Sequence, residues 1–278
     1  MPTAPSNGID VYYEQHGSGE PLLLIMGLAG DSLAWLYQRD AFAAHYRTVV
    51  FDNRGVGRTS KPAGPYSIAQ MADDAAGLMN ALDIGRAHVV GVSMGGMIAQ
   101  ELALRHPQRV RSLVLGCTYA RPDAGVTATF EESLAHFGGR KGADGAIEVD
   151  LTTLDPMAFI QRLLPLTFTP QFMMNELPKM IQVFAGALQH GFDLGAIMSQ
   201  VSATQAHDAL DRLAQIAAPT LVLTGDSDLL IPPANSELIA ARIPGATLQQ
   251  IAGGSHGFNF EKPDEFNAAV LGFLARCN

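Results

Sequence analysis

The stretch His88-Val89-Val90-Gly91-Val92-Ser93-Met94-Gly95-Gly96 decides the expected fold. Its first half is continuously apolar, which indicates a strand buried on both faces. Its second half opens a segment of helical spacing that continues to Arg105. Between the two lies Gly-x-Ser-x-Gly, in which the serine occupies a strained strand-to-helix turn and glycines stand where side chains would clash. We therefore expect the Ser93 hydroxyl above the carboxyl edge of a sheet, where open α/β folds bind ligands.

Outward from this turn, short apolar runs alternate with longer segments of helical periodicity. Continuous rather than alternating hydrophobicity is what a parallel sheet covered by helices requires. Residues 9–15 alternate instead, which predicts an antiparallel edge strand. The whole pattern favours an α/β fold with a mostly parallel, doubly wound sheet. The predicted strands are 9–15, 21–26, 48–51, 88–92, 110–115, 219–224 and 247–251, and the predicted helices are 67–82, 94–105 and 263–276.

Residues 119–217 break this alternation. The segment is rich in Met, Phe and Leu and holds no convincing buried strand. We interpret it as a helical cap (lid) inserted between two strands of the sheet, over the ligand site. The core domain would then comprise residues 1–118 and 218–278. The prolines expected to divide the insertion into short helices are Pro156, Pro165, Pro170 and Pro178.

Composition excludes several classes of protein. A hydrophobic content of 47% is ample for a large core, and a net charge of −9 without a basic patch argues against a nucleic-acid partner. The start, Met1–Gly8, lacks a basic n-region and an apolar h-region, so we expect no signal peptide there. The longest apolar runs, such as Leu22–Met26, are too short to span a bilayer. Cys117 and Cys277 are expected to be free thiols. We expect a cytoplasmic protein with no membrane partner; a homo-oligomer is left open.

A base must activate a serine hydroxyl before it becomes a good nucleophile. His256 is the histidine we predict for this task. It follows the last predicted strand in Gly253-Gly-Ser-His-Gly257, where small neighbours let an imidazole approach the serine. The other histidines precede strands, lie in a turn or at a helix end, or belong to the insertion.

A third residue, an acid, must orient the imidazole and stabilise its cation. Two acids follow the strand that ends near Thr224. We choose Asp228 and keep Asp226 in reserve, and the acid not used would be a turn residue bonded to its own backbone. The chain order is then serine, acid, histidine, as in one of the three known orders of such triads.

Acyl transfer also requires donors for the oxyanion that forms on the carbonyl. The backbone N–H of Met94, directly after the serine, would be one donor. The second would come from the loop after strand 21–26, and Leu28 is our choice. Because both donors belong to the backbone, the side chains at these positions can vary without loss of the oxyanion hole.

Cofactor and metal motifs are missing from the sequence. No Gly-x-Gly-x-x-Gly follows the first buried strand, and no phosphate-binding loop occurs. No His-Glu-x-x-His or clustered His and Cys indicates a metal. We therefore predict neither a cofactor nor a metal.

With these residues in place, the chain resembles the α/β-hydrolase superfamily over nearly its whole length apart from the insertion. The matching pieces are Leu23–Leu28, Phe51–Ser60, the turn around Ser93, Gly225–Pro232 and Gly254–Pro263. In that family the aspartate three residues after the glycine, here Asp228, usually completes the triad. One departure is Met26-Gly27, where many relatives carry His-Gly. The resemblance is greatest to the branch of small carboxylesterases and 3-oxoadipate enol-lactonase-like enzymes.

The leading expectation is hydrolysis of a small-to-medium carboxylic ester or lactone through an acyl-enzyme intermediate. The apolar insertion favours a hydrophobic acyl or alcohol group of modest size. Carbon–carbon bond hydrolysis and cofactor-free haloperoxidase-like perhydrolysis use the same triad, and both stay open. A non-catalytic ligand-binding module that retains the fold is the alternative of a different class.

Overall fold

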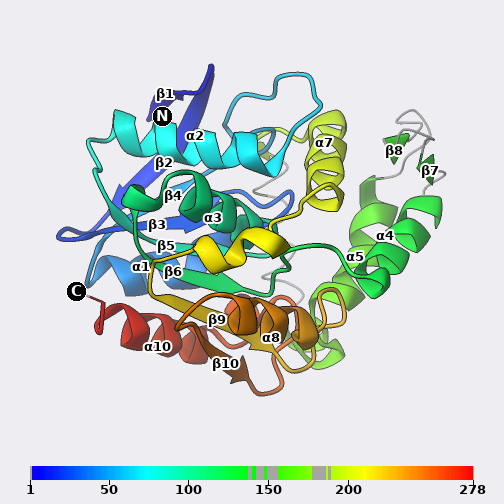
Figure 1. Ribbon diagram of the computed structural model, residues 1–278. Helices are drawn as coiled ribbons and strands as arrows, with labels where there is room; N and C mark the ends of the chain where they lie inside the picture. The colour runs from blue at the N-terminus through cyan, green and yellow to red at the C-terminus, as the bar shows by residue number, and fades with distance from the viewer. Residues whose placement is uncertain are drawn as a thin grey trace.

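A computed structural model of the chain describes residues 2–136, 140–141, 147–148, 156–176, 186 and 189–277. Eight strands form one sheet in the order β1-β2-β4-β3-β5-β6-β9-β10 (Figure 1). β2 pairs antiparallel with both of its neighbours, and every other pairing in this sheet is parallel. The strands are β1 (Thr3–Ser6), β2 (Ile9–His16), β3 (Pro21–Ile25), β4 (Arg47–Phe51), β5 (Ala87–Val92), β6 (Val110–Gly116), β9 (Thr220–Gly225) and β10 (Thr247–Ile251).

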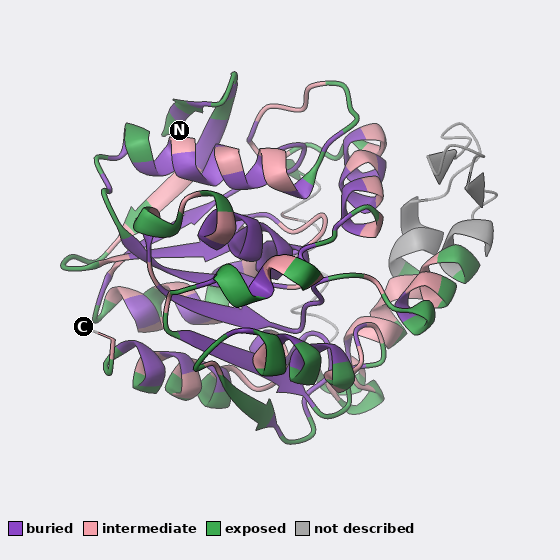
Figure 2. Cartoon of the chain, in the orientation of Figure 1, coloured by how far each residue is buried: buried purple, intermediate pink, exposed green. Residues whose placement is uncertain are grey.

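Two apolar layers bury the central strands, whose residues are buried on both sides of the sheet (Figure 2). In β3, Leu23 and Ile25 enter the layer shared with α2 and α3, whereas Leu22 and Leu24 enter the layer shared with α1 and α10. The period of two in a strand thus distributes one continuous apolar run over two cores. The predicted doubly wound α/β sheet is confirmed.

The helices follow the strands as the alternation requires. Ser67 caps α2, with its hydroxyl accepting from the Gln70 N–H at 3.1 Å. The predicted helix 94–105 matches α3 in full, and the predicted helix 263–276 ends two residues early, at Leu274. The helices are α1 (Leu36–Ala43), α2 (Ile68–Ala81), α3 (Met94–Arg105), α4 (Ala124–His136), α5 (Pro156–Thr167), α7 (Leu194–Gln205), α8 (Pro233–Arg242), α9 (Phe258–Glu261) and α10 (Pro263–Leu274), with 3₁₀ turns at Ser32–Trp35, Pro107–Arg109 and Leu210–Gln215.

One strand prediction was wrong. β2 is not an edge strand, because β1 pairs along its outer side from Thr3↔Tyr12 to Ser6↔Ile9. β1 reads Thr-Ala-Pro-Ser, which carries no apolar run and so gave no strand signal. Its proline suits the outermost position, where a strand needs fewer backbone donors.

Between β6 and β9 the chain leaves the sheet and forms α4, α5 and α7. In Figure 1, α4 and α5 lie beside the sheet. α7 packs against the segment before α2, because a Cβ on Gly64 would stand 2.2 Å from Ser199 Oγ. Pro165 lies inside α5 and does not divide it, contrary to the sequence expectation, whereas Pro156 is the first residue of that helix. Pro178 is outside the described residues. The strands β7 (Arg140–Lys141) and β8 (Ile147–Glu148) pair only with each other.

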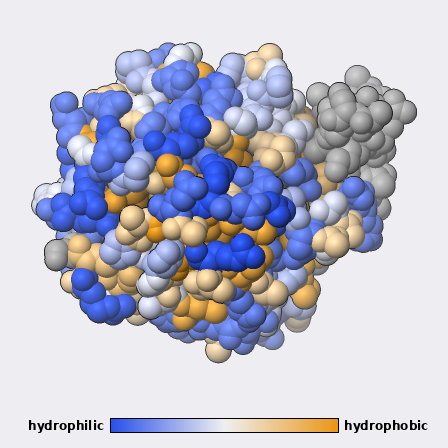
Figure 3. All heavy atoms as spheres, in the orientation of Figure 1, coloured by the Kyte–Doolittle hydropathy of each residue, from blue (hydrophilic) through white to orange (hydrophobic). Residues whose placement is uncertain are grey.

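The face of the molecule in Figure 3 is mainly hydrophilic, with apolar atoms interspersed. No helix in the described part of the chain is both long enough and apolar enough to cross a membrane. Both cysteines are free, as predicted.

His207 follows α7 and is a buried histidine with an unusual proton affinity. Its side chain is 4% exposed, packs at 6.4 Å from the Tyr119 ring, and leaves Nε2 without a hydrogen-bond partner among the described residues. Burial, opposed by the nearby Glu101 carboxylate, lowers its pKa from 6.5 to about 4. The imidazole is therefore neutral in the folded protein at pH 7.

His207 makes stability depend on pH. Between pH 6.5 and about 4, His207 is protonated in the unfolded chain but neutral in the folded chain. The contribution of His207 to the free energy of unfolding is therefore fully present above pH 6.5 and is lost as the pH is lowered. At pH 5 this loss amounts to about 2 kcal/mol. Urea denaturation of wild type and His207→Gln at pH 7 and pH 5 measures it. The variant should lose less stability on acidification, and equal losses in the two proteins would refute this role for His207.

Candidate active site

Ser93 occupies a strained turn between β5 and α3. Its backbone has φ 55° and ψ −124°, and its N–H donates to the Gly116 carbonyl at 2.9 Å. A Cβ on Gly91 would stand 2.2 Å from the Gly95 carbonyl oxygen, and one on Gly95 would stand 2.0 Å from that of Ile25. Only glycine fits at either position, which is the reason that the turn needs Gly-x-Ser-x-Gly.

The structure brings Ser93, His256 and Asp228 together from three separate loops. His256 Nε2 lies 3.0 Å from Ser93 Oγ, and its Nδ1 lies 2.8 Å from Asp228 Oδ2. The other carboxylate oxygen of Asp228 accepts from the N–H groups of Leu230 and Ile231 at 2.9 and 2.8 Å. Both the acid and the histidine are buried. This arrangement can pass the serine proton to an imidazole whose other nitrogen is held by a carboxylate.

Asp226, the reserve acid, is exposed and bonds to neither His256 nor Ser93 in the described structure. Its Oδ1 accepts from the Gly253 N–H at 2.8 Å and from the Ser227 hydroxyl at 3.0 Å. It therefore joins two neighbouring loops by bonding to the backbone. This is close to the turn role expected for the acid that the site does not use.

The two backbone groups predicted as oxyanion donors border Ser93. Met94 is the first residue of α3, where a helix leaves N–H groups without an intrahelical acceptor. The loop that carries Leu28 also reaches the serine, because a Cβ on Gly27 would stand 3.0 Å from Ser93 Cβ. Among the described residues the Leu28 N–H donates to no backbone carbonyl.

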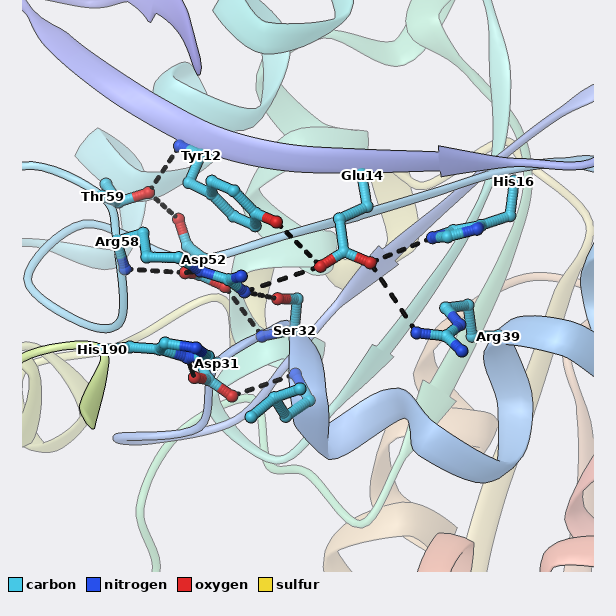
Figure 4. A network of polar contacts seen from close by, with 11 residues as sticks. Tyr12, Glu14, His16, Asp31, Ser32, Arg39, Asp52, Arg58, Thr59 and His190 are labelled. Carbon is cyan, nitrogen blue, oxygen red and sulfur yellow. Dashed lines mark hydrogen bonds and ion pairs between the residues drawn. The ribbon is translucent and has the colours of Figure 1, made fainter. Parts of the chain in front are cut away.

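A polar network holds the far side of this loop (Figure 4). The fully buried Asp52 accepts from the N–H groups of Ser32 and Arg58, each at 2.8 Å. Asp31 caps the 3₁₀ turn through the Leu33 N–H at 3.0 Å and pairs with Nδ1 of His190 at 2.7 Å. The segment after β3 is thus fixed both from the core and from the chain between β6 and β9.

Glu261 holds the His256 loop against the end of α5. Its Oε2 accepts from the N–H and the hydroxyl of Ser255 at 3.0 and 2.6 Å, and its Oε1 accepts from the N–H and hydroxyl of Thr169 at 2.6 and 2.9 Å. Sequence reasoning placed Glu261 in a matching motif and gave it no role. Thr169 lies 92 residues from Glu261 along the chain, so the sequence pattern held no signal of this contact.

Loss of the Glu261 hydrogen bonds to Ser255 and Thr169 should destabilise the protein. In Glu261→Gln one carboxylate oxygen becomes an NH₂ group, which is a donor and cannot accept hydrogen bonds. The pair of donors that faces this group, from Ser255 or from Thr169, therefore loses its acceptor. We expect the free energy of unfolding to fall by about 1–3 kcal/mol, as for other hydrogen bonds to a charged group. Urea denaturation measures the loss, with the exposed Glu265→Gln as the matched control. Equal urea midpoints of unfolding for the two variants would show that these Glu261 hydrogen bonds contribute nothing to stability.

Apolar side chains of α7 pack against the loop that carries Leu28. Met198 and Val201 of α7 form a small buried cluster with Leu28 and Phe130. Phe168 closes against the His256 loop, because a Cβ on Gly257 would stand 2.3 Å from its ring. Three arginines of this part of the chain pair with carboxylates: Arg121 with Asp208 and Asp211, Arg162 with Glu132, and Arg212 with Glu101.

Cys117 is the other nucleophilic side chain close to the turn. Burial raises the pKa of its thiol well above the ordinary value of 9.0. The thiol therefore stays protonated and is a poor competitor for Ser93. Within the described ranges, no group of three or more His, Cys, Asp or Glu residues could hold a metal ion.

A family profile for the alpha/beta hydrolase fold matches residues 20–263. The chain belongs to this family. The protein named "Putative carbamate hydrolase RutD" from Azorhizobium caulinodans is 33% identical to it, over 98% of each chain. The solved enol-lactonase from Burkholderia xenovorans LB400 has a TM-score of 0.83 and 29% identity, covering 99% of this alpha/beta hydrolase and 100% of that chain. Est816, described as an N-acyl homoserine lactone degrading enzyme, has a TM-score of 0.83 and 31% identity, covering 98% of this chain and 100% of that chain.

Proposed function

We propose that this protein is a serine hydrolase that cleaves a carboxylic ester or lactone through an acyl-enzyme intermediate. The observation that carries the proposal is the hydrogen-bonded series from Ser93 through His256 to Asp228, at 3.0 and 2.8 Å. The series lies beside two backbone N–H groups at the carboxyl edge of the sheet. This combination of nucleophile, base, orienting acid and oxyanion donors is what acyl transfer requires.

In the first half-reaction, Ser93 Oγ attacks the carbonyl carbon while His256 Nε2 takes its proton. The carboxylate of Asp228 stabilises the imidazolium that forms. The carbonyl oxygen, now negative, accepts from the N–H groups of Met94 and Leu28. As the tetrahedral intermediate collapses, the imidazolium returns its proton to the leaving alcohol oxygen, and the acyl group stays on Ser93.

In the second half-reaction, His256 takes a proton from water, whose oxygen attacks the acyl-serine. Collapse of this second intermediate releases the carboxylic acid and returns the proton to Ser93 Oγ. With a lactone the alcohol and acid belong to one molecule, so the product is a single hydroxy acid.

Two further observations support the substrate class. The apolar cluster of Leu28, Met198 and Val201, which includes a residue of the loop next to Ser93, favours a hydrophobic acyl or alcohol group. The similar enol-lactonase and the N-acyl homoserine lactone degrading enzyme favour a lactone. We further propose that residues 119–217 form the cap over this site and that residues 1–118 and 218–278 form the core.

Carbamate hydrolysis is a second candidate, favoured by the 33% identity to the relative named as a carbamate hydrolase. It uses the same attack on a carbonyl carbon and the same oxyanion donors. It differs in the leaving group and in the carbamoyl-serine that water must then cleave.

The proposal is tested by measuring hydrolysis rates of wild type and of Ser93→Ala with three substrate series. These are p-nitrophenyl esters from acetate to octanoate, a series of lactones and a series of phenyl carbamates. We expect turnover of esters or lactones by wild type and its loss in the variant. The acyl chain length that is hydrolysed fastest indicates the size of the acyl pocket. Preference for the carbamates would favour the second candidate. No turnover of any of the three by wild type would contradict the proposal and favour carbon–carbon hydrolysis, perhydrolysis or a binding role.

A further inference from the structure

Gln200 of α7 is a fully buried glutamine that joins two core loops. Its Oε1 accepts from the Ala29 N–H at 3.0 Å, and its Nε2 donates to the Arg54 carbonyl at 2.7 Å. These partners lie 171 and 146 residues away along the chain. Since one partner can only donate and the other can only accept, the orientation of the amide is fixed by its surroundings.

The Arg54 end of this connection lies in a buried ion pair. The Arg54 guanidinium forms two hydrogen bonds to the Asp74 carboxylate, at 2.8 and 2.6 Å, and both side chains are buried. Bidentate pairs of this kind fix geometry strongly. Gln200 therefore holds Ala29 from a rigid part of the core.

The Ala29 end belongs to the loop of the proposed oxyanion donor. Ala29 has φ 58°, a left-handed conformation that a non-glycine residue adopts at a cost. On the other side of the loop, Asn53 Nδ2 donates to the Met26 carbonyl at 2.8 Å. The peptide between Gly27 and Leu28, which carries the donor N–H, is thus flanked by one peptide held by Asn53 and one held by Gln200.

We infer that Gln200 is a positioning residue that holds the oxyanion loop from the α7 side, so that the Leu28 N–H points at the carbonyl oxygen of the bound substrate. This inference rests on the proposed hydrolase function. Gln200 and Asn53 hold the two sides of this loop through the Ala29 N–H and the Met26 carbonyl.

Loss of this support should affect the transition state more than the ground state, because the oxyanion exists only after attack. Removal of an oxyanion donor costs about 10²- to 10³-fold in kcat, and misplacement of a donor costs less. For Gln200→Met, which preserves length but lacks both polar atoms, we expect kcat to fall roughly 10- to 100-fold with little change in KM.

A trifluoromethyl ketone separates this effect from a purely structural one. Ser93 Oγ bonds to the ketone carbon, its proton passes to His256, and the former carbonyl oxygen becomes an anion in the oxyanion hole. Its inhibition constant should rise in Gln200→Met by about the factor by which kcat/KM falls. Gln100→Met is the matched control, because Gln100 is also fully buried and donates to a backbone carbonyl, that of Tyr119 at 3.0 Å, from α3.

Gln200→Glu gives a second, independent readout. A protonated glutamic acid can both accept from Ala29 and donate to Arg54, whereas the ionised form cannot donate. The ratio of its kcat to that of wild type should therefore decrease as the pH rises through the pKa of the new carboxyl group.

The experiment measures kcat, KM and ketone inhibition for wild type, Gln200→Met, Gln200→Glu and Gln100→Met. A selective loss of kcat and of ketone affinity in the two Gln200 variants supports the inference. Values for both Gln200 variants within twofold of Gln100→Met overturn it and leave Gln200 as a structural contact only. A wild type that neither hydrolyses the esters and lactones nor binds the ketone overturns the proposed function itself, and this inference with it.

Discussion

Ser93→Ala should lower kcat for ester or lactone hydrolysis by on the order of 10⁴- to 10⁶-fold. The variant removes the only side-chain oxygen that His256 Nε2 contacts in the described structure, at 3.0 Å. The strained backbone at this turn is compatible with alanine no less than with serine, so the fold should persist. Rates measured with p-nitrophenyl esters check the loss, and circular dichroism checks the fold.

Ser227→Ala is the matched control for this variant. Ser227 is an exposed serine whose hydroxyl bonds to Asp226 at 3.0 Å, outside the series that ends on Ser93. Its activity should equal that of wild type. Retention of more than about a tenth of the wild-type rate by Ser93→Ala would mean that hydrolysis does not pass through this hydroxyl.

Asp228→Asn should lower kcat on the order of 10⁴-fold with the geometry of the site retained. The asparagine NH₂ group would donate to His256 Nδ1, so the imidazole would carry its proton on Nε2. In that tautomer Nε2 cannot accept the Ser93 proton. The Leu230 and Ile231 N–H groups, which now bond to Asp228 Oδ1, would hold the amide oxygen.

Asp226→Asn provides the comparison for Asp228→Asn, because the sequence kept Asp226 as the alternative acid. The exposed Asp226 bonds to the Gly253 N–H, and its amide form can still accept that bond. Its kcat should stay within a few-fold of wild type. A larger loss in Asp226→Asn than in Asp228→Asn would reverse the assignment of the two acids.

The parts of the structure that could be predicted from the sequence are those with a local signal. The run into Ser93 contains the strand, the turn and the helix in consecutive residues, and β5 and α3 match it closely. The central strands are recognisable in the sequence as continuous apolar runs, because both of their faces are buried. β1 has no such run, so its pairing with β2 was missed.

The contacts that hold the site depend on residues far apart in the chain, and a single sequence gives no signal of them. Gln200 looks like any polar residue on a helix, yet its amide bonds to Ala29, 171 residues away. Glu261 was noticed only as part of a motif. Asn53 lies in a stretch that already resembled the family, so its position could have suggested a supporting role, although its bond to the Met26 carbonyl could not be foreseen.

Covalent labelling by a serine-directed phosphonate tests the central claim most directly. The Ser93 oxygen would bond to phosphorus with loss of the leaving group, and the phosphoryl oxygen would mimic the oxyanion. We predict one adduct per chain by intact mass, mapped to the peptide that contains Ser93, and little or none in His256→Ala. An unlabelled wild type, or an adduct that persists in Ser93→Ala, would contradict the assignment of Ser93 as the nucleophile.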